Sequence, residues 1–129
     1  MKTVLCHCGN ATPYASCCGS FHSGLETPAT AELLMRSRYS AYVARLEDYL
    51  LATWHASTRP DALDFSEAGK TKWLGLEIKR HSAVDTNHAQ VEFIARFKNG
   101  GSSAVRLHEV SDFVFEDGRW FYLSGVFPN

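Results

Sequence analysis

The residues with the clearest capacity for chemistry are four cysteines within the first 18 positions of the 129-residue chain. They are Cys6, Cys8, Cys17 and Cys18. Zinc prefers four soft ligands in a tetrahedral arrangement, and thiolates supply them at ~2.3 Å. A Cys-x-Cys pair can place both sulfurs on one ion if the backbone turns sharply, and Gly9 can adopt the positive φ of such a turn. We expect Gly19 to act in the same way after the second pair. The spacing thus predicts one structural zinc ion.

Two other uses of these cysteines fit the sequence less well. Adjacent cysteines such as Cys17 and Cys18 rarely bridge each other, because the small ring strains the peptide bond between them. A disulfide or redox role would need an oxidising compartment in which disulfides persist, whereas thiols stay reduced in the cytoplasm. A catalytic zinc site keeps one coordination position open and usually has histidine ligands. His22 stays open as an alternative ligand that would replace one thiolate.

Charge and hydropathy exclude several classes of partner. The formal net charge is −1, so the whole molecule has no field that attracts nucleic acid or acidic lipid. Before Cys6 only Val4 and Leu5 are strongly apolar, which is too little for the core of a signal peptide. No run approaches the ~20 apolar residues of a membrane span. We therefore expect a cytoplasmic protein with no membrane partner, in which thiols stay reduced.

The cysteine segment resembles the SEC-C motif, which is best known at the C-terminus of the preprotein translocase ATPase SecA. That motif has Cys-x-Cys-Gly-Ser, a short linker with a tyrosine, and then Cys-Cys or Cys-His before glycine. The matching residues here are Cys6-His7-Cys8-Gly9-Asn10, Tyr14 and Cys17-Cys18-Gly19. The resemblance implies that the four cysteines are the zinc ligands and that the zinc knuckle docks a protein or ribosomal partner. Thr12-Pro13 replaces a more basic linker, which weakens the case for such docking.

The elements that must position these residues begin after a change of composition near Thr27-Pro28. We expect residues 1–26 to form the zinc-binding motif, here called the zinc knuckle, and residues 27–129 to form one α+β domain. Apolar residues then recur every three or four positions, which predicts an α-helix capped by Thr30 or by Thr27. They are Leu34, Met35, Tyr39, Tyr42, Val43 and Leu46. We expect a break near Leu46–Asp48, followed by shorter helices over 48–55 and 66–72.

The second half of the chain alternates apolar and polar residues, as half-buried strands do. The alternation covers 74–78, 91–97, 105–115 and 119–123. Asn99-Gly100-Gly101 marks one turn, and Asp117-Gly118 is typical of a two-residue hairpin. Helices followed by four antiparallel strands in a meander indicate an α+β fold.

The chain also resembles the bacterial YchJ family over nearly its whole length, including the SEC-C element. The segments that carry this resemblance are 34–43, 48–55, 73–76, 91–93, 108–109 and 116–120. The resemblance implies a nuclear transport factor two-like (SnoaL-like) domain, in which a curved antiparallel sheet wraps around a long helix to form a cone. It leaves the activity open. Val110-Ser111-Asp112-Phe113 stands where the family more often has arginines, which weakens an anion-binding role for this strand.

A cone-shaped fold often contains a ligand cavity where sheet and helix part. The candidates for its lining are polar residues close to aromatic ones: Arg38, Tyr42, Trp54, His55, His108, Glu109 and Tyr122. No catalytic set stands out among them. His108 and Glu109 are consecutive in a predicted strand and point to opposite faces, which counts against a simple acid–base dyad. Arg36 and Arg38 lie two positions apart and so on different faces of the predicted helix. One of them could face solvent while the other closes over the cavity or bonds Glu109, and an internal salt bridge is the simplest role for this pair.

Two functions from different classes remain open at this point. An adaptor would dock a protein or the ribosome through the zinc knuckle, with the cone domain as scaffold. A small-ligand-binding protein or an enzyme would instead use the cavity. A cone filled by its own aromatic side chains favours the adaptor, whereas a cavity on which Arg38, His55 or Glu109 converge favours a ligand. Exposed sheet faces of this fold often pair, so a homodimer is also open.

Overall fold

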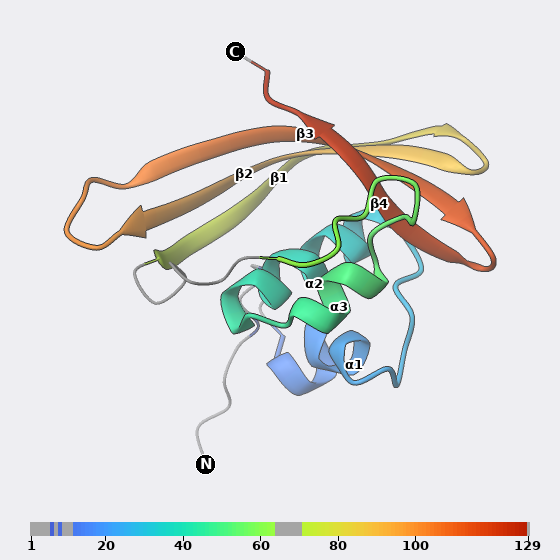
Figure 1. The fold of residues 1–129 in the computed structure, drawn as a ribbon, viewed down its shortest axis with the longest axis horizontal. Helices are drawn as coiled ribbons and strands as arrows, with labels where there is room; N and C mark the ends of the chain where they lie inside the picture. Colours follow the sequence, from blue (N-terminus) through green and yellow to red (C-terminus); the bar gives the residue numbers. More distant parts are fainter. Residues whose placement is uncertain (1–5, 7, 9–11, 64–70, 129) are drawn as a thin grey trace.

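The computed structural model describes residues 6, 8, 12–63 and 71–128 (Figure 1). The elements run in the order η1 (Tyr14–Ser16), α1 (Cys18–His22), α2 (Ala31–Ala44), α3 (Glu47–Ala52), β1 (Thr71–Asp85), β2 (His88–Asn99), β3 (Val105–Glu116) and β4 (Arg119–Val126). The strands form one sheet in the order β1-β2-β3-β4, with every neighbouring pair antiparallel. The predicted α+β meander is confirmed. Within the described residues, no helix has the length and apolar character needed to cross a membrane.

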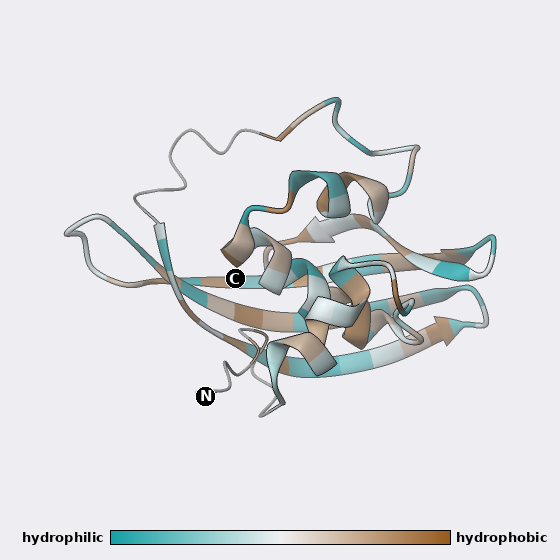
Figure 2. Ribbon diagram, turned by 90° about the horizontal axis from the view of Figure 1, so that it is seen from below, coloured by the Kyte–Doolittle hydropathy of each residue, from teal (hydrophilic) through white to brown (hydrophobic). Residues whose placement is uncertain are grey.

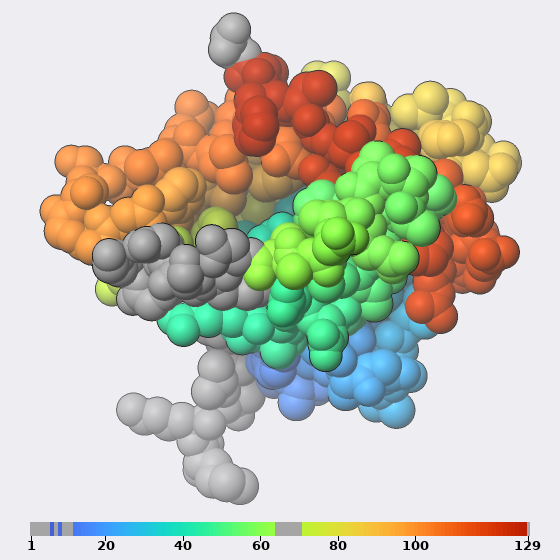
Figure 3. Space-filling model, in the orientation of Figure 1, coloured from blue at the N-terminus to red at the C-terminus, as the bar shows by residue number. Residues whose placement is uncertain are grey.

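The molecule has three layers, with α2 in the middle. The curved sheet covers one side of α2 and α3, and α1 lies on the side of α2 away from the sheet (Figure 1). In the space-filling view the N-terminal residues, in blue, lie against the green helical layer, at the opposite side of the molecule from most of the sheet (Figure 3). Helix α2 therefore contacts the sheet on one face and the N-terminal segment and α3 on another.

Helix α2 begins at an N-cap that the sequence contains. Thr30 has an extended backbone, and its Oγ1 accepts a hydrogen bond from the Leu33 N–H at 3.1 Å. The helix ends at Ala44, and the next residue, Arg45, has a left-handed φ of 58°. The break expected near Leu46–Asp48 is thus confirmed: Leu46, the last residue of the predicted apolar stripe, lies outside α2, as the N-cap of α3.

The two alternative caps can be separated by substitution. We expect Thr30→Ala to lower the free energy of unfolding by about 1 kcal/mol, because the Leu33 N–H loses its acceptor. Thr27→Ala is the matched control, since Thr27 is exposed and precedes the helix. Urea unfolding measures both variants. An equal loss for the two would contradict the assignment of Thr30 as the cap.

The main core lies between α2 and the concave face of the sheet. Alternate residues of β2 point into it, as the period of two requires. Its buried members are Ala31, Leu34, Met35, Tyr39, Ala89, Val91, Phe93, Ala95 and Phe113. Viewed from the helical side, apolar stretches of the helices lie in front of apolar stretches of the strands (Figure 2).

The helix expected over 48–55, α3, is shorter than predicted, because the residues that follow it form backbone hydrogen bonds with β4. The Tyr122 N–H donates to the Thr53 carbonyl at 2.8 Å, and the His55 N–H donates to the Tyr122 carbonyl at 2.8 Å. Trp54 thereby forms a bridge to Tyr122. The helix α3 consequently stops at Ala52, not at residue 55.

Two other boundaries differ from the prediction. The first strand was expected over 74–78, but it begins at Thr71 and continues to Asp85 along β2. The predicted helix over 66–72 lies outside the described residues as far as position 70, and its last two positions belong to β1. The 117–118 turn is confirmed: Asp117 has φ 53° and Gly118 has φ 81°, as a type I′ hairpin turn requires.

Candidate metal centre and cavity

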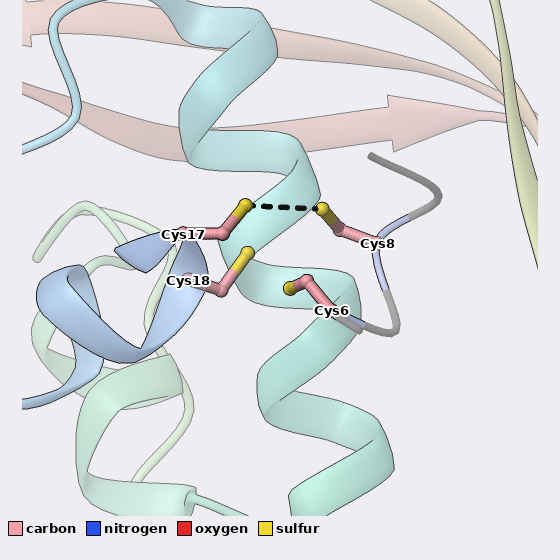
Figure 4. Close-up of side chains that lie close together, drawn as sticks. All are labelled: Cys6, Cys8, Cys17 and Cys18. Carbon is pink, nitrogen blue, oxygen red and sulfur yellow. Dashed lines mark hydrogen bonds between the residues drawn. The ribbon is translucent and has the colours of Figure 1, made fainter. Parts of the chain in front are cut away.

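The four cysteine side chains converge in front of α2 (Figure 4). Their sulfurs all lie within 4.8 Å of one another, and the sulfurs of Cys8 and Cys17 are 3.6 Å apart. Sulfurs at ~2.3 Å around a tetrahedral ion are about 3.8 Å apart. The observed spacing is too long for a disulfide bond of about 2.05 Å, and none of the four cysteines forms a disulfide. The cluster therefore has the geometry of a four-sulfur metal site.

Burial and the neighbouring thiols would keep Cys17 and Cys18 protonated if no cation were bound. Hydrogen bonding with Cys8, and then burial, raises the pKa of the Cys18 thiol above its ordinary value. Burial is the largest cause of the raised pKa of Cys17. A divalent ion reverses this balance because it replaces the protons and keeps a coordinating thiol deprotonated. A closed set of four sulfur ligands, three of them buried, fits a structural ion.

Backbone hydrogen bonds hold the first cysteine pair in place. The Cys6 N–H donates to the Thr12 carbonyl at 2.8 Å, which joins the first pair to the segment that leads to the second pair. Arg36 of α2 donates from Nη1 to the Cys8 carbonyl at 2.8 Å. The same arginine pairs with Glu32 one turn earlier at 3.1 Å, which orients its side chain. The first pair is thus attached to α2 through its backbone as well as through its sulfurs.

Gly19 is required for a different reason from the one expected. A Cβ atom at this position would lie 2.7 Å from the Tyr14 carbonyl oxygen and 2.9 Å from its ring. The prediction of a positive φ at Gly19 is wrong, because this residue is not among the glycines with positive φ. Close packing of Tyr14 against the cysteine cluster demands the glycine. Gly9, the other expected turn residue, lies outside the described residues.

His22 lies beside the metal centre with both ring nitrogens hydrogen-bonded elsewhere. Its Nε2 donates to the Ser37 carbonyl of α2 at 2.8 Å, so Nδ1 of the neutral ring accepts from the Tyr14 hydroxyl at 2.5 Å. The ring also packs edge-on against Tyr49 of α3. The described four-residue cluster contains cysteines alone. His22 therefore joins α1 to α2 and α3 and is not placed as a fourth ligand.

This position of His22 predicts a pH dependence of stability. Burial lowers the pKa of His22 below its ordinary value of about 6.5. The unfolded chain therefore binds a proton below about pH 6.5 that the folded chain rejects. The contribution of neutral His22 to the free energy of unfolding is fully present above about pH 6.5. It is lost as the pH falls toward the pKa of His22 in the folded protein.

We expect the free energy of unfolding of the metal-loaded protein to fall between pH 7.5 and pH 5.5, and to fall less in His22→Gln. Thiolate protonation also acts in this range, so the difference between the two proteins is the quantity of interest. Urea unfolding at several pH values measures it. An equal fall of the free energy of unfolding with pH in both proteins would contradict the assignment of this pH dependence to His22.

A cavity of about 250 Å³ lies between α2 and the concave face of the sheet. All four strands contribute to its wall. The lining consists of Met35, Arg38, Tyr39, Tyr42, Trp73, Phe93, Ala95, Leu107, Glu109, Ser111 and Tyr122. The structure thus brings together four of the seven residues expected from the sequence, namely Arg38, Tyr42, Glu109 and Tyr122.

Arg38 is the buried cation of this cavity, with 2% of its surface exposed. Its Nη1 donates to the Leu50 carbonyl at 2.8 Å and to the Thr53 Oγ1 at 2.7 Å, at the C-terminal end of α3. The guanidinium carbon lies 4.6 Å from the centre of the Tyr122 ring and 5.1 Å from that of Trp54. Trp54 therefore contacts Arg38 but is not part of the lining.

Glu109 is the acidic group of the cavity. One carboxylate oxygen accepts hydrogen bonds from the Ser111 hydroxyl and, at 3.4 Å, from the Tyr122 hydroxyl. Gly125 leaves room for this carboxylate, because a Cβ atom there would overlap it. The ion pairs among the described residues do not include one between Arg38 and Glu109. Of the two arginines for which a salt bridge was expected, Arg36 forms one, with Glu32.

The two histidines that were expected in the cavity lining, His55 and His108, lie outside it. His55 pairs with Glu116 at 2.8 Å beyond the end of α3. His108 pairs with Glu92 at 2.6 Å, on the opposite face of the sheet from Glu109. Consecutive strand residues point to opposite faces, as expected, and the two histidines are outside the described lining.

The sequence also contained partial signals for lining residues that were missed. Ser111 follows Glu109 by two positions and so must share its face. Tyr39 follows Met35 by four positions on the α2 face that meets the sheet. Phe93 is the cross-strand partner of Glu109, and that register becomes visible once the strands are paired.

Comparison with known proteins agrees with this architecture. The family model described as the YchJ middle NTF2-like domain matches residues 30–125. The chain belongs to the YchJ family. A UPF0225 protein of Xanthomonas campestris is 56% identical over 118 residues, which cover 92% of this chain and 91% of the relative. A UPF0225 protein of Chromobacterium violaceum is 56% identical over 125 residues, which cover 94% and 91%.

Two solved structures resemble this YchJ-family member along nearly its whole length. The solution structure of a SEC-C motif containing protein from Rhodopseudomonas palustris has a TM-score of 0.86 at 33% identity, with 98% of this chain and 100% of that chain covered. The crystal structure of a SEC-C motif containing protein from Psychrobacter arcticus has a TM-score of 0.80 at 32% identity, with 97% and 83% covered. The YchJ match begins at Thr30, the N-cap of α2, and the four-cysteine cluster precedes it.

Proposed function

We propose that this YchJ-family protein binds a small ligand in the cavity between α2 and the sheet, and that one zinc ion on the four cysteines is structural. The observation that carries the proposal is a pair of opposite charges, Arg38 and Glu109, that both line the cavity without pairing with each other. Burying a polar group costs free energy unless it is hydrogen-bonded. A ligand that contacts both groups would supply the hydrogen bonds that they do not make to each other.

The rest of the lining supports a ligand. Small-molecule sites are mostly apolar and aromatic, with a few polar groups that fix orientation. Eight of the eleven lining residues are apolar or aromatic, and the other three are Arg38, Glu109 and Ser111. The cavity also opposes the adaptor hypothesis, which expected a cone filled by its own aromatic side chains.

Zinc is the ion that the cysteine cluster favours. Soft thiolates select zinc, copper(I) or iron–sulfur clusters, and a closed tetrahedral set of four sulfurs is typical of structural zinc. The resemblance to SEC-C motif proteins supports the same ligand set. The ion would hold the zinc knuckle against the side of α2 away from the sheet, where Cys6 Sγ lies 3.9 Å from Ser40 Oγ.

The adaptor role has one observation in its favour. Leu25, in the segment between α1 and α2, is 80% exposed and lies close in sequence to the zinc knuckle's second cysteine pair. An exposed leucine of this kind would suit a protein or ribosomal partner. The metal-binding sulfurs themselves face α2, so docking is secondary in this proposal.

The proposal predicts that filling the cavity abolishes binding of small molecules. We expect fragments from a chemically diverse library to shift the backbone amide resonances of Glu109, Ser111 and Tyr122 in the zinc-loaded protein. Ala95→Phe should abolish these shifts, because Ala95 lines the cavity and a phenyl ring there would project into the ligand space.

The matched control is Ala104→Phe, the same substitution at an exposed position beyond β2. It should leave fragment binding unchanged. Two results would overturn the proposal: no fragment that shifts these resonances in the wild-type protein, or fragment binding that survives in Ala95→Phe. Far-UV circular dichroism checks that both variants fold.

A further inference from the structure

Arg38 presents hydrogen-bond donors to the cavity. Its Nη1 is occupied by the Leu50 carbonyl and Thr53 Oγ1, and within the described residues its Nε and Nη2 have no acceptor. The described residues also contain no fully occluded side-chain nitrogen or oxygen without a partner. Because Arg38 is 2% exposed and lines the cavity, its remaining donors reach the cavity space. A buried donor of this kind requires an acceptor, which water or a ligand must supply.

Glu109 presents the complementary acceptor. Its Oε2 receives the Ser111 and Tyr122 hydroxyls, and within the described residues its Oε1 has no donor. The carboxylate lines the same cavity as Arg38. The cavity therefore offers a charged donor and a charged acceptor that do not form an ion pair with each other among the described residues.

These two charges argue for a ligand without net charge. The formal charges of Arg38 and Glu109 cancel within the cavity. An anionic ligand would pair with Arg38 but would place a second negative charge beside Glu109. A cationic ligand would have the same difficulty with Arg38. A neutral group with one acceptor and one donor satisfies both residues and leaves no buried charge uncompensated.

The rest of the lining argues for a planar ring. Trp73 lies edge-on to Tyr39, with ring centres 5.5 Å apart, and its centre is 6.3 Å from that of Tyr42. Phe93 adds a further aromatic wall. The volume of about 250 Å³ is below the ~300–1,000 Å³ of common ligand pockets, which limits the ligand to one ring or two fused rings.

We infer that the ligand is a neutral, planar cyclic amide, whose carbonyl accepts from Arg38 and whose ring N–H donates to Glu109. The inference rests on the proposed ligand-binding function and adds to it the chemical class of the ligand. Lactam heterocycles and the keto forms of nucleobases carry such an edge. The aromatic walls would hold the ring, and the charged pair would fix its orientation.

The test compares three bicyclic probes of similar size on the zinc-loaded protein. Quinolin-2-one has the carbonyl and the N–H, quinoline lacks both the carbonyl and the donor, and 2-naphthoate has a negative charge. We expect quinolin-2-one to bind at least ~10-fold more tightly than either of the others, since hydrogen bonds to charged groups are the strong ones. Titration of the Glu109 and Ser111 amide resonances gives the three dissociation constants.

One substitution tests the role of the acidic group. Glu109→Gln should weaken quinolin-2-one at least ~10-fold and should tighten 2-naphthoate, because the charge that repels the anion is removed. Glu92→Gln is the matched control: it removes the same charge from the neighbouring strand on the opposite face of the sheet, and should change neither constant.

The outcomes separate this inference from the proposed function. If 2-naphthoate or quinoline binds most tightly to the wild-type protein, the cavity is a ligand site but the cyclic-amide assignment is overturned. Equal effects of Glu109→Gln and Glu92→Gln would also overturn it. If none of the probes binds and the fragment library yields no cavity ligand either, both the inference and the proposed function fail.

Discussion

Cys8→Ser should abolish stoichiometric metal binding and lower the free energy of unfolding by more than about 4 kcal/mol, the range typical of losing a structural metal. Cys8 is fully buried, and its sulfur lies 3.6 Å from that of Cys17. A serine hydroxyl is a poor substitute for a thiolate as a ligand of a soft ion. Structural zinc in small peptides contributes ~10–16 kcal/mol to folding at pH 7, so one lost ligand has a large effect.

The loss should reach beyond the zinc knuckle because α2 packs against it. Ser37 and Ser40 of α2 are fully buried. His22 and Arg36 also connect the knuckle region to α2, through the Ser37 and Cys8 carbonyls. Release of the N-terminal segment would expose this side of α2 to water. We expect the sheet domain to stay folded at 25 °C, with a lower melting temperature.

Metal content by atomic emission and thermal unfolding by circular dichroism measure the two effects. Ser16→Ala is the control, since Ser16 is exposed and directly precedes Cys17. It should retain the metal and the wild-type melting temperature. A Cys8→Ser protein that retains one metal ion per chain would show that the four sulfurs do not act as one site.

The second large effect is expected in the main core, at Phe113. Phe113→Ala should lower the free energy of unfolding by about 3–5 kcal/mol, the range for truncating a buried phenylalanine. Phe113 is 1% exposed and packs edge-on against Tyr122, with ring centres 5.8 Å apart. Its removal would leave a void between α2 and β3 that the close-packed sheet cannot fill.

Phe115 provides a closely matched control. It lies two positions further along β3, so it points to the same side of the strand, but 37% of its surface is exposed. Phe115→Ala should therefore cost much less than Phe113→Ala in urea unfolding. Similar losses for the two variants would mean that burial by α2 does not determine the stability of this strand.

Local features of this protein were predictable from the sequence by itself. The cysteine spacing predicted one cluster because ligands close in sequence need only a tight loop to converge. Thr30 predicted the start of α2, and Asp117-Gly118 predicted a hairpin, because caps and turns depend on a few neighbouring residues. Hydrophobic alternation predicted the strands and the α+β class, although not the full length of β1.

Tertiary structure alone decided which polar residues are buried and which side chains meet. Helix α2 is buried on a second side as well, where Ser37 and Ser40 lie. The N-terminal segment and α3 cover this polar side of the helix, which lies outside the apolar stripe. The sequence left open whether Arg36 or Arg38 would reach the cavity, and the structure places Arg38 there, bound to the end of α3. Such partners lie far apart in the chain, so they follow from strand register and from how the layers pack, which local sequence patterns do not specify.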